Sequence, residues 1–250
     1  LSIYGTLNLI TMKLFILSIA LSTLSFSYSQ ESKIGKEGDN LDLYATLELF
    51  KNANTVEDFE NELNKEKNEV NNLDLNDDGF VDYIKVIDYS EDNIHTLTLQ
   101  VPTSETESQD VAVIELEKTG DEIVSAQIVG DEDLYGANYI VEEKTNSSTK
   151  THNAYHWKAV NHIYGPRYVT WISPWKFNRH PKWFTPWKPI SWSKYNARVQ
   201  HHHSKHVRVS RLRSQRAHTH YRKHRVHHKS TQHKTVAKKK GVKRHKKRHH

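Results

Sequence analysis

The chain contains no cysteine among its 250 residues. Disulfides and thiolate metal sites are therefore excluded, and so is a lipid anchor that needs a cysteine after an export cleavage site. Any metal ion must be held by histidine and by oxygen ligands.

Acidic residues are absent from the whole second part of the chain. All 30 Asp and Glu lie at or before Glu143, and that stretch holds only 8 lysines and no arginine, so its net charge is 8 − 30 = −22. From Lys144 onward there are 28 Lys and Arg and no acid. A split of this kind is typical of a basic region that binds polyanions.

Long apolar runs are also lacking, and the longest one lies near the start. Met12-Lys13 precedes an apolar run at 14–24, and small residues follow at Ser27 and Ser29. This run is shorter than the roughly 20 residues that span a bilayer. The pattern predicts a signal peptide at 12–29, cleaved before Gln30. We expect an exported protein that is periplasmic, outer-membrane-associated or secreted. Residues 1–11 precede the only methionine and are interpreted as a non-native upstream segment.

Residues 40–143 are predicted to fold as one small acidic α+β domain after a linker at 30–39. Apolar spacing favours a helix at Leu43–Phe50 and a second one that Thr55 caps, with Asp58 three residues later. Four β-rich runs follow at 80–88, 94–101, 111–117 and 123–129, with a short fifth run at 138–142. Short connections predict two N-terminal helices packed on a small antiparallel sheet, followed by an extended or disordered basic tail.

The clearest chemical motif is an acidic loop of the form D-x-N-x-D-G-x-x-D. Alternate oxygen side chains around Gly79 suit the six to eight oxygens that Ca²⁺ prefers. The predicted ligands are Asp74, Asn76, Asp78, the carbonyl of Phe80, and Asp82. An Asp/Asn/Gly turn without an ion is the alternative.

This loop departs from the EF-hand pattern at its twelfth position. Lys85 stands where an EF-hand has its bidentate Glu, and a strand-like run follows Gly79. The loop looks like calcium loops that lead into β-hairpins, as in FG-GAP repeats, and its predicted affinity is micromolar to millimolar. A second acidic cluster, Asp131-Glu132-Asp133, is interpreted as a solvated loop.

The stretch from Leu41 to Glu143 resembles a group of uncharacterised exported proteins of the Bacteroidetes. The resemblance rests on residues 71–76, 109–113 and 128–136, and on the aromatic segment that follows. It implies an envelope or secreted location in a Gram-negative cell, and it brings no activity and no catalytic residues.

A linker at 144–156 leads to a Trp/Pro-rich basic segment at 157–196. This segment holds all six tryptophans, and Pro174-Trp175-Lys176 recurs as Pro186-Trp187-Lys188. Three uses stay open: packing back onto the acidic domain, insertion into a lipid interface, or stacking on sugars or bases.

Residues 197–250 are predicted to be a disordered His/Lys/Arg-rich tail, because they have almost no large apolar group to bury. Its cations are candidates for binding lipopolysaccharide, polysaccharide, nucleic acid or a membrane surface, or for masking the acidic half of the same chain. The candidate polyanion-binding residues are Arg222, Lys223, Arg225, Lys238, Lys239, Lys240, Lys243, Arg244, Lys246, Lys247 and Arg248. The candidate Zn, Ni or Cu ligands are His201, His202, His203, His218, His220, His224, His227 and His228.

Three function classes compete. The first is a non-enzymatic envelope or secreted protein with a calcium-stabilised domain and a polyanion-binding tail. The second is a transition-metal buffer that uses the His-rich tail. An enzyme is the least favoured, because no nucleophile elbow, HExxH, Walker loop or dinucleotide fingerprint is present.

Overall fold

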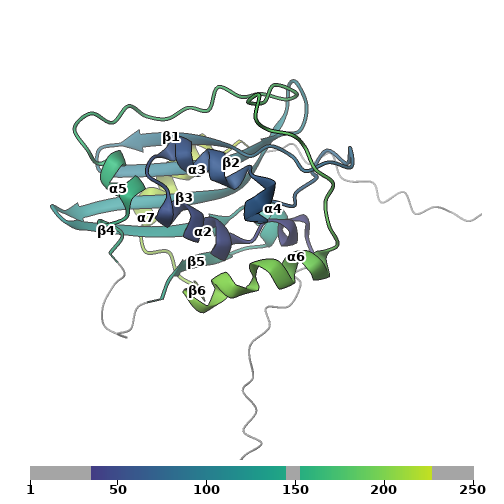
Figure 1. Ribbon diagram of the computed structural model, residues 1–250. Coiled ribbons are helices and arrows are strands. Elements are labelled where there is room, and N and C mark those ends of the chain that lie inside the picture. Colours follow the sequence, from purple (N-terminus) through teal and green to yellow (C-terminus); the bar gives the residue numbers. More distant parts are fainter. Residues whose placement is uncertain (1–34, 145–152, 227–250) are drawn as a thin grey trace, which may run out of the picture. The chain divides into compact units, whose positions relative to one another are not determined.

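The computed structural model describes residues 35–144 and 153–226. The expected class is confirmed: an α+β fold with a six-stranded antiparallel sheet and several helices (Figure 1). The predicted signal peptide at 12–29 and the tail from residue 227 lie outside the described residues.

Six strands pair in chain order, β1-β2-β3-β4-β5-β6. Their bounds are β1 Lys85–Glu91, β2 Ile94–Pro102, β3 Ser108–Gly120, β4 Ile123–Gly130, β5 Ile140–Glu143 and β6 His206–Val209. The first predicted strand begins later than expected, because the acidic loop continues to residue 84. The other four predicted strands match β2 to β5 within a few residues.

Helices α2 (Leu43–Asn52) and α3 (Val56–Leu63) follow the short η1 (Glu37–Asn40). The N-terminal cap of α2 is Asp42, whose side chain accepts from the Ala45 amide at 2.7 Å. Thr55 caps α3 as predicted, accepting from the Asp58 amide at 3.0 Å. The η2 turn (Glu66–Asn68) ends this helical part.

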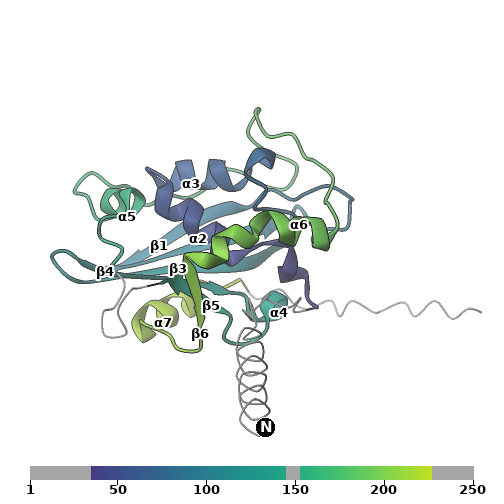
Figure 2. The same cartoon turned by 60° about the horizontal axis from the view of Figure 1, so that its bottom comes forward.

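The apolar core lies between these helices and one face of the sheet. Leu47, Phe50 and Phe59 are fully buried against strand residues such as Leu97 and Ile114. Figure 2 shows α2 and α3 on one side of the sheet and α7 (Gln215–His224) on the other. Alternation along the strands sorts side chains between an apolar face and a polar face.

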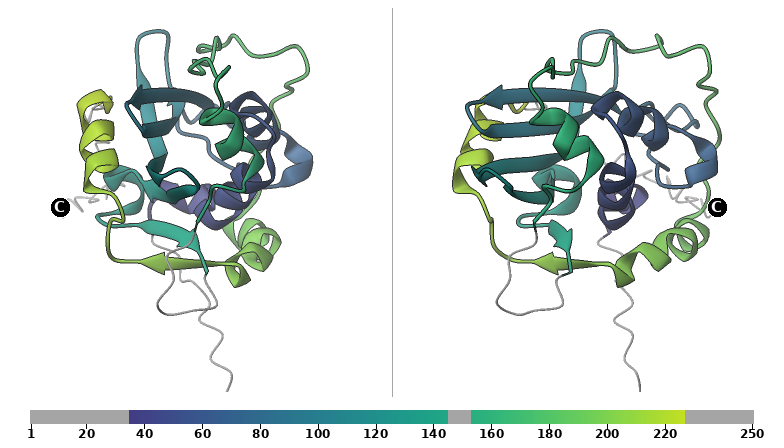
Figure 3. Two further views of the ribbon diagram at one scale, coloured as in Figure 1. Left: turned by 90° about the vertical axis from the view of Figure 1, so that its left-hand side faces the viewer. Right: turned by 60° about the vertical axis from the view of Figure 1, so that its left-hand side comes forward.

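The second half of the chain does not extend away from the domain. After α4 (Glu132–Tyr135) and β5, it forms α5 (Lys158–Ile163), α6 (Trp192–Val199), η3 (Gln200–Ser204), β6 and α7. Strand β6 adds to the sheet by pairing with β5, and α7 crosses the face opposite α2 (Figure 3).

The expectation of disorder from residue 197 is therefore wrong for 197–226. Composition alone predicted too little burial, but Val199, Ala217 and Tyr221 are buried. The remaining ordering comes from charged and polar contacts with the acidic half, which a count of apolar residues cannot detect.

Candidate functional site

The acidic loop folds back on itself around its own carboxylates. The Asp74 carboxylate accepts from the backbone amides of Asp78 (3.1 Å) and Gly79 (3.0 Å). Asn76 Oδ1 accepts from the Asp78 amide at 2.9 Å, and Asp78 Oδ1 from the Phe80 amide at 2.9 Å. Gly79 has a φ of 84°, where a side chain would be strained. These bonds hold three of the predicted ligand side chains, those of Asp74, Asn76 and Asp78, within one turn.

Asp82 closes the loop from its far end. Its carboxylate accepts from the Leu75 amide at 2.6 Å and from Asn76 Nδ2 at 2.9 Å. Burial, together with the negative charges of Asp74 and Asp78, raises the pKa of Asp82 to about 7. A hard cation would offset negative charge of this kind. The Phe80 side chain is exposed.

The loop is tied to the Trp/Pro segment, of which we call residues 164–191 the strap. The Val81 amide donates to the Trp187 carbonyl at 2.7 Å. Asn72 exchanges two hydrogen bonds with the backbone of Ile190, at 2.8 and 3.0 Å. These hydrogen bonds connect the loop and its flanking residues to the strap.

The strap also covers the open edge of the sheet. The Asp88 amide donates to the Trp171 carbonyl and the Ser173 amide to the Val86 carbonyl, which extends the ladder beyond β1. Tyr168 donates to Asp88 Oδ2 at 2.7 Å, next to the buried ion pair of Asp88 with His95. An edge protected in this way is not available for pairing with another chain.

Tryptophans of the segment divide into two groups. Trp157 is buried in the main core, and Trp171 Nε1 donates to the buried Glu60 at 3.0 Å. Trp183, by contrast, is 45% exposed. Packing back onto the domain is thus one use of these tryptophans, and it leaves an aromatic surface open.

Cations of the strap lie exposed and without an acidic partner. Five basic side chains between 164 and 191 form no ion pair within the described part of the chain: Arg167, Lys176, Arg179, Lys182 and Lys188. The exposed Val169 (83%), Ile172 (66%) and Trp183 lie among them in sequence. The strap therefore presents positive charge and apolar groups together.

Cations of the α7 segment (residues 211–226), in contrast, largely pair with the acidic half. Arg216 reaches Glu117 at 3.0 Å, His218 reaches Glu115 at 2.8 Å, and Lys223 reaches Glu91 at 3.1 Å. The Arg213–Glu142 pair is buried, with side chains 9% and 4% exposed. Arg225 reaches Asp131 at 2.7 Å, so this acid is not in a solvated loop as the sequence suggested. Most cations of this segment therefore pair with acids of the same chain.

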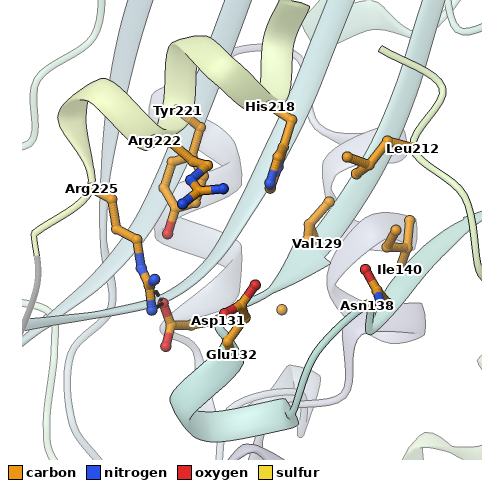
Figure 4. Close-up of a pocket in the computed structure, with 11 residues that line it drawn as sticks. Val129, Asp131, Glu132, Asn138, Ile140, Leu212, His218, Tyr221, Arg222 and Arg225 are labelled. Atoms are coloured by element: carbon orange, nitrogen blue, oxygen red, sulfur yellow. Dashed lines mark hydrogen bonds and ion pairs between the residues drawn. The ribbon is translucent and has the colours of Figure 1, made fainter. Parts of the chain in front are cut away.

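A small pocket lies under α7, between this helix and the β4–β5 end of the sheet (Figure 4). Its volume is about 60 Å³, and polar side chains of Asp131, Asn138, His218 and Arg222 line it. Organic ligands occupy roughly 300 Å³ or more, so this pocket has room for water or a small ion.

Histidines predicted as metal ligands are scattered by the fold. His201 bonds to the Arg198 carbonyl, His203 to Asp42 at 2.6 Å, and His218 to Glu115. His220 and His224 lie on α7, with ring centroids 4.7 Å apart. His227 and His228 lie outside the described residues. Over 35–144 and 153–226, no three His, Asp or Glu side chains stand grouped so as to hold a metal ion.

Of the predicted polyanion-binding residues, three are described. Lys223 and Arg225 are engaged in ion pairs, and Arg222 is exposed at the rim of the small pocket. Those from Lys238 to Arg248 lie outside the described residues.

One residue that sequence reasoning missed is Glu60 on α3. It is 1% exposed, and burial raises its pKa. Its carboxylate accepts from Tyr83 Oη, the Val86 amide, Trp171 Nε1 and Ser173 Oγ at 2.8–3.0 Å. The sequence held a sign that Glu60 is buried, because Glu60 follows the core residue Phe59 and stands three residues before the core residue Leu63, at helical spacing.

Comparisons with known proteins give no further lead. No protein family, no curated protein and no solved structure matches this chain. Among the described residues, no helix has the length and apolar character needed to cross a membrane.

Proposed function

We propose that this is an exported, non-enzymatic envelope or secreted protein whose basic half binds an anionic polymer or surface. The observation that carries the proposal is the strap, where five exposed cations have no acidic partner among residues 35–144 and 153–226 and lie among exposed apolar side chains. The α7 segment supports it by contrast, because its charges are already used within the molecule. The proposed binding surface is thus the strap. The candidate polyanion-binding residues from Lys238 to Arg248 would add to it.

Neutralising two strap lysines tests this proposal. Lys182→Gln with Lys188→Gln is expected to weaken binding to duplex DNA, used as a generic polyanion, and to lower the slope of log K against log salt by about 2. The matched control is Lys65→Gln with Lys67→Gln, which removes the same charge from the acidic half. Vesicles of anionic and of neutral lipid distinguish a membrane surface from a polymer. Equal binding by both double variants would rule out the strap as the binding surface.

The acidic loop supplies the second part of the proposal, a calcium site that stabilises the domain. Support comes from the carboxylates of Asp74 and Asp78, which accept hydrogen bonds within one turn, from the buried Asp82, and from the hydrogen bonds between the loop and the strap. Asp74, Asn76, Asp78 and Asp82 would hold the ion with side-chain oxygens. Its role is structural, since it would offset charge repulsion and fix the strap.

Calcium stabilisation is expected to grow with pH. The folded pKa of Asp82, about 7, lies above its ordinary value of 3.8, so without calcium this group destabilises the fold increasingly as pH rises through that window. Calcium binds the ionised form and removes this penalty. We compare the two pH values at one calcium concentration, 100 times the Kd that applies at pH 8. This concentration should raise the melting temperature by about 5–10 °C at pH 8 and by less at pH 5.5, where calcium binds more weakly.

Asp74→Asn should abolish this calcium shift, whereas Asp77→Asn, with the same charge change at a non-ligand position, should keep it. Calorimetric melting of the full chain with calcium and with chelator measures the effect. Identical midpoints for the wild type under both conditions would eliminate the calcium site.

The alternative function is transition-metal buffering by the His-rich tail. One observation favours it: Nδ1 of His224 is bonded to the His220 carbonyl, which leaves Nε2 of the exposed His224 available. Saturable Ni²⁺ or Zn²⁺ binding without polyanion binding would support this alternative over the first.

A further inference from the structure

The strap holds a large share of the exposed apolar side chains of the molecule. Six large apolar side chains are exposed among the described residues, and three of them, Val169, Ile172 and Trp183, lie in this one segment. Apolar residues scattered singly over a surface are normal. Their concentration on a segment that also carries exposed cations is typical of a surface that contacts a partner.

The fold points Ile172 outward. The strap runs outside β1 (Figure 1), and Ile172 forms an antiparallel bridge with Ile87 of that strand. Trp171 Nε1 and Ser173 Oγ both donate to the Glu60 carboxylate, at 3.0 and 2.9 Å. Successive side chains of an extended segment point to opposite sides. Ile172 therefore faces away from Glu60 and α3, and its exposure follows from how its two neighbours are held.

Trp183 is also held in place by a buried neighbour. Phe184 is buried and packs edge-on against Tyr83, with ring centroids 5.0 Å apart. The Trp183 ring lies edge-on to Phe184 at 6.3 Å between centroids and remains exposed. The backbone that carries this indole is thus anchored to the domain. An exposed aromatic group on an anchored backbone loses little conformational freedom when it binds a partner.

Cations stand next to these apolar groups along the strap. Lys182 directly precedes Trp183, and Arg167 stands two positions before Val169. All four of these side chains are exposed. Basic and aromatic side chains together are typical of segments at a membrane interface, where the cations meet lipid phosphates and the apolar groups enter the boundary with the acyl chains.

The aliphatic side chains distinguish a lipid surface from a polymer. An anionic polymer would account for the five cations of the strap by charge alone. It offers no apolar environment for Val169 and Ile172, which gain free energy only by leaving water. An anionic bilayer accounts for both features, because it attracts the cations and takes up the apolar groups.

We propose that the strap binds anionic lipid bilayers, with Val169, Ile172 and Trp183 entering the interface between head groups and acyl chains. This proposal rests on the binding role of the strap proposed above and names its partner. The strap would lie on the membrane surface, and the domain behind it would stay in water.

Binding of the full chain to mixed phosphatidylglycerol–phosphatidylcholine vesicles tests the proposal. Val169→Ser with Ile172→Ser is expected to weaken binding by about tenfold, because two side chains no longer transfer apolar surface out of water. Trp183→Ser should weaken it by a similar factor. The matched control is Ile123→Ser, which removes an exposed apolar side chain from the acidic half and should leave vesicle binding unchanged.

Brominated lipids give a second measurement, because bromine quenches the fluorescence of tryptophans that enter the bilayer. Vesicles that contain them should quench the wild type more strongly than Trp183→Ser. Equal quenching of the two proteins would overturn the insertion of Trp183.

Duplex DNA separates this proposal from the proposed function. The apolar variants should keep the salt slope of DNA binding, because that slope counts neutralised phosphates. If they also bind vesicles as the wild type does, or if the wild type binds DNA but no vesicles, the lipid partner is overturned and binding of a polymer stands. A wild type that binds neither overturns both proposals. Self-association that the apolar variants lose would assign the strap to a second copy of this chain and overturn the lipid partner.

Discussion

Replacing Glu60 with alanine is expected to reduce the free energy of unfolding by about 3–5 kcal/mol. The carboxylate accepts four hydrogen bonds, from Tyr83, Val86, Trp171 and Ser173. Without it, buried donors lose their acceptor, and each such loss costs about 1–3 kcal/mol. Because two of the donors belong to the strap, the strap should also loosen. Urea unfolding measures the first effect, and the rate of trypsin cleavage at Lys176 and Lys182 measures the second.

Glu57→Ala is the control for this prediction. Glu57 lies on the same helix and is exposed, and the substitution removes the same charge. The free energy of unfolding should therefore change by no more than about 0.5 kcal/mol. If Glu60→Ala loses less than about 1 kcal/mol and the strap resists trypsin as before, the carboxylate does not hold the strap in place.

Removing the Arg213 side chain is expected to cost about 3–5 kcal/mol, because it leaves the buried Glu142 carboxylate without its partner. The Arg213 amide also donates to Gln127 Oε1 at 3.1 Å, which places the residue at the entrance to α7. Loss of the pair should therefore release α7 from the polar face of the sheet. Hydrogen exchange of α7 amides and the urea midpoint of Arg213→Ala both report this release.

Lys223→Ala is the matched control on the same helix. The Lys223–Glu91 pair is exposed, with side chains 56% and 53% accessible, and such pairs contribute little to stability because water and salt screen them. Adding Glu142→Leu to Arg213→Met should restore most of the lost stability, since an apolar pair removes the buried charge. An Arg213→Ala effect no larger than that of Lys223→Ala would show that burial of the pair adds nothing.

Local patterns predicted much of the acidic half. The Thr55 cap, the buried face of Leu43, Leu47 and Phe50, and the runs that became β2 to β5 depend on spacing and on short-range hydrogen bonds, and these are local properties. The acidic loop was found in the same way, because its backbone amides bond to side chains two to five residues away. The start of β1 was predicted too early along the chain. Phe80 to Ile84 contact the strap and side chains at α3, and they do not pair with a neighbouring strand.

The sequence by itself determined the charge boundary at Glu143, the absence of thiol chemistry and the α+β class. Only the tertiary structure decided where the basic half goes, because the contacts that hold it join residues far apart in the sequence. Arg213 pairs with Glu142, Trp171 bonds to Glu60, and His206 faces Glu48 because the folded sheet and helices bring these residues together. Charge attraction favours such contacts in general, but the packing of β6 on β5 and of α7 on the polar face selects which cations pair and leaves those of the strap exposed.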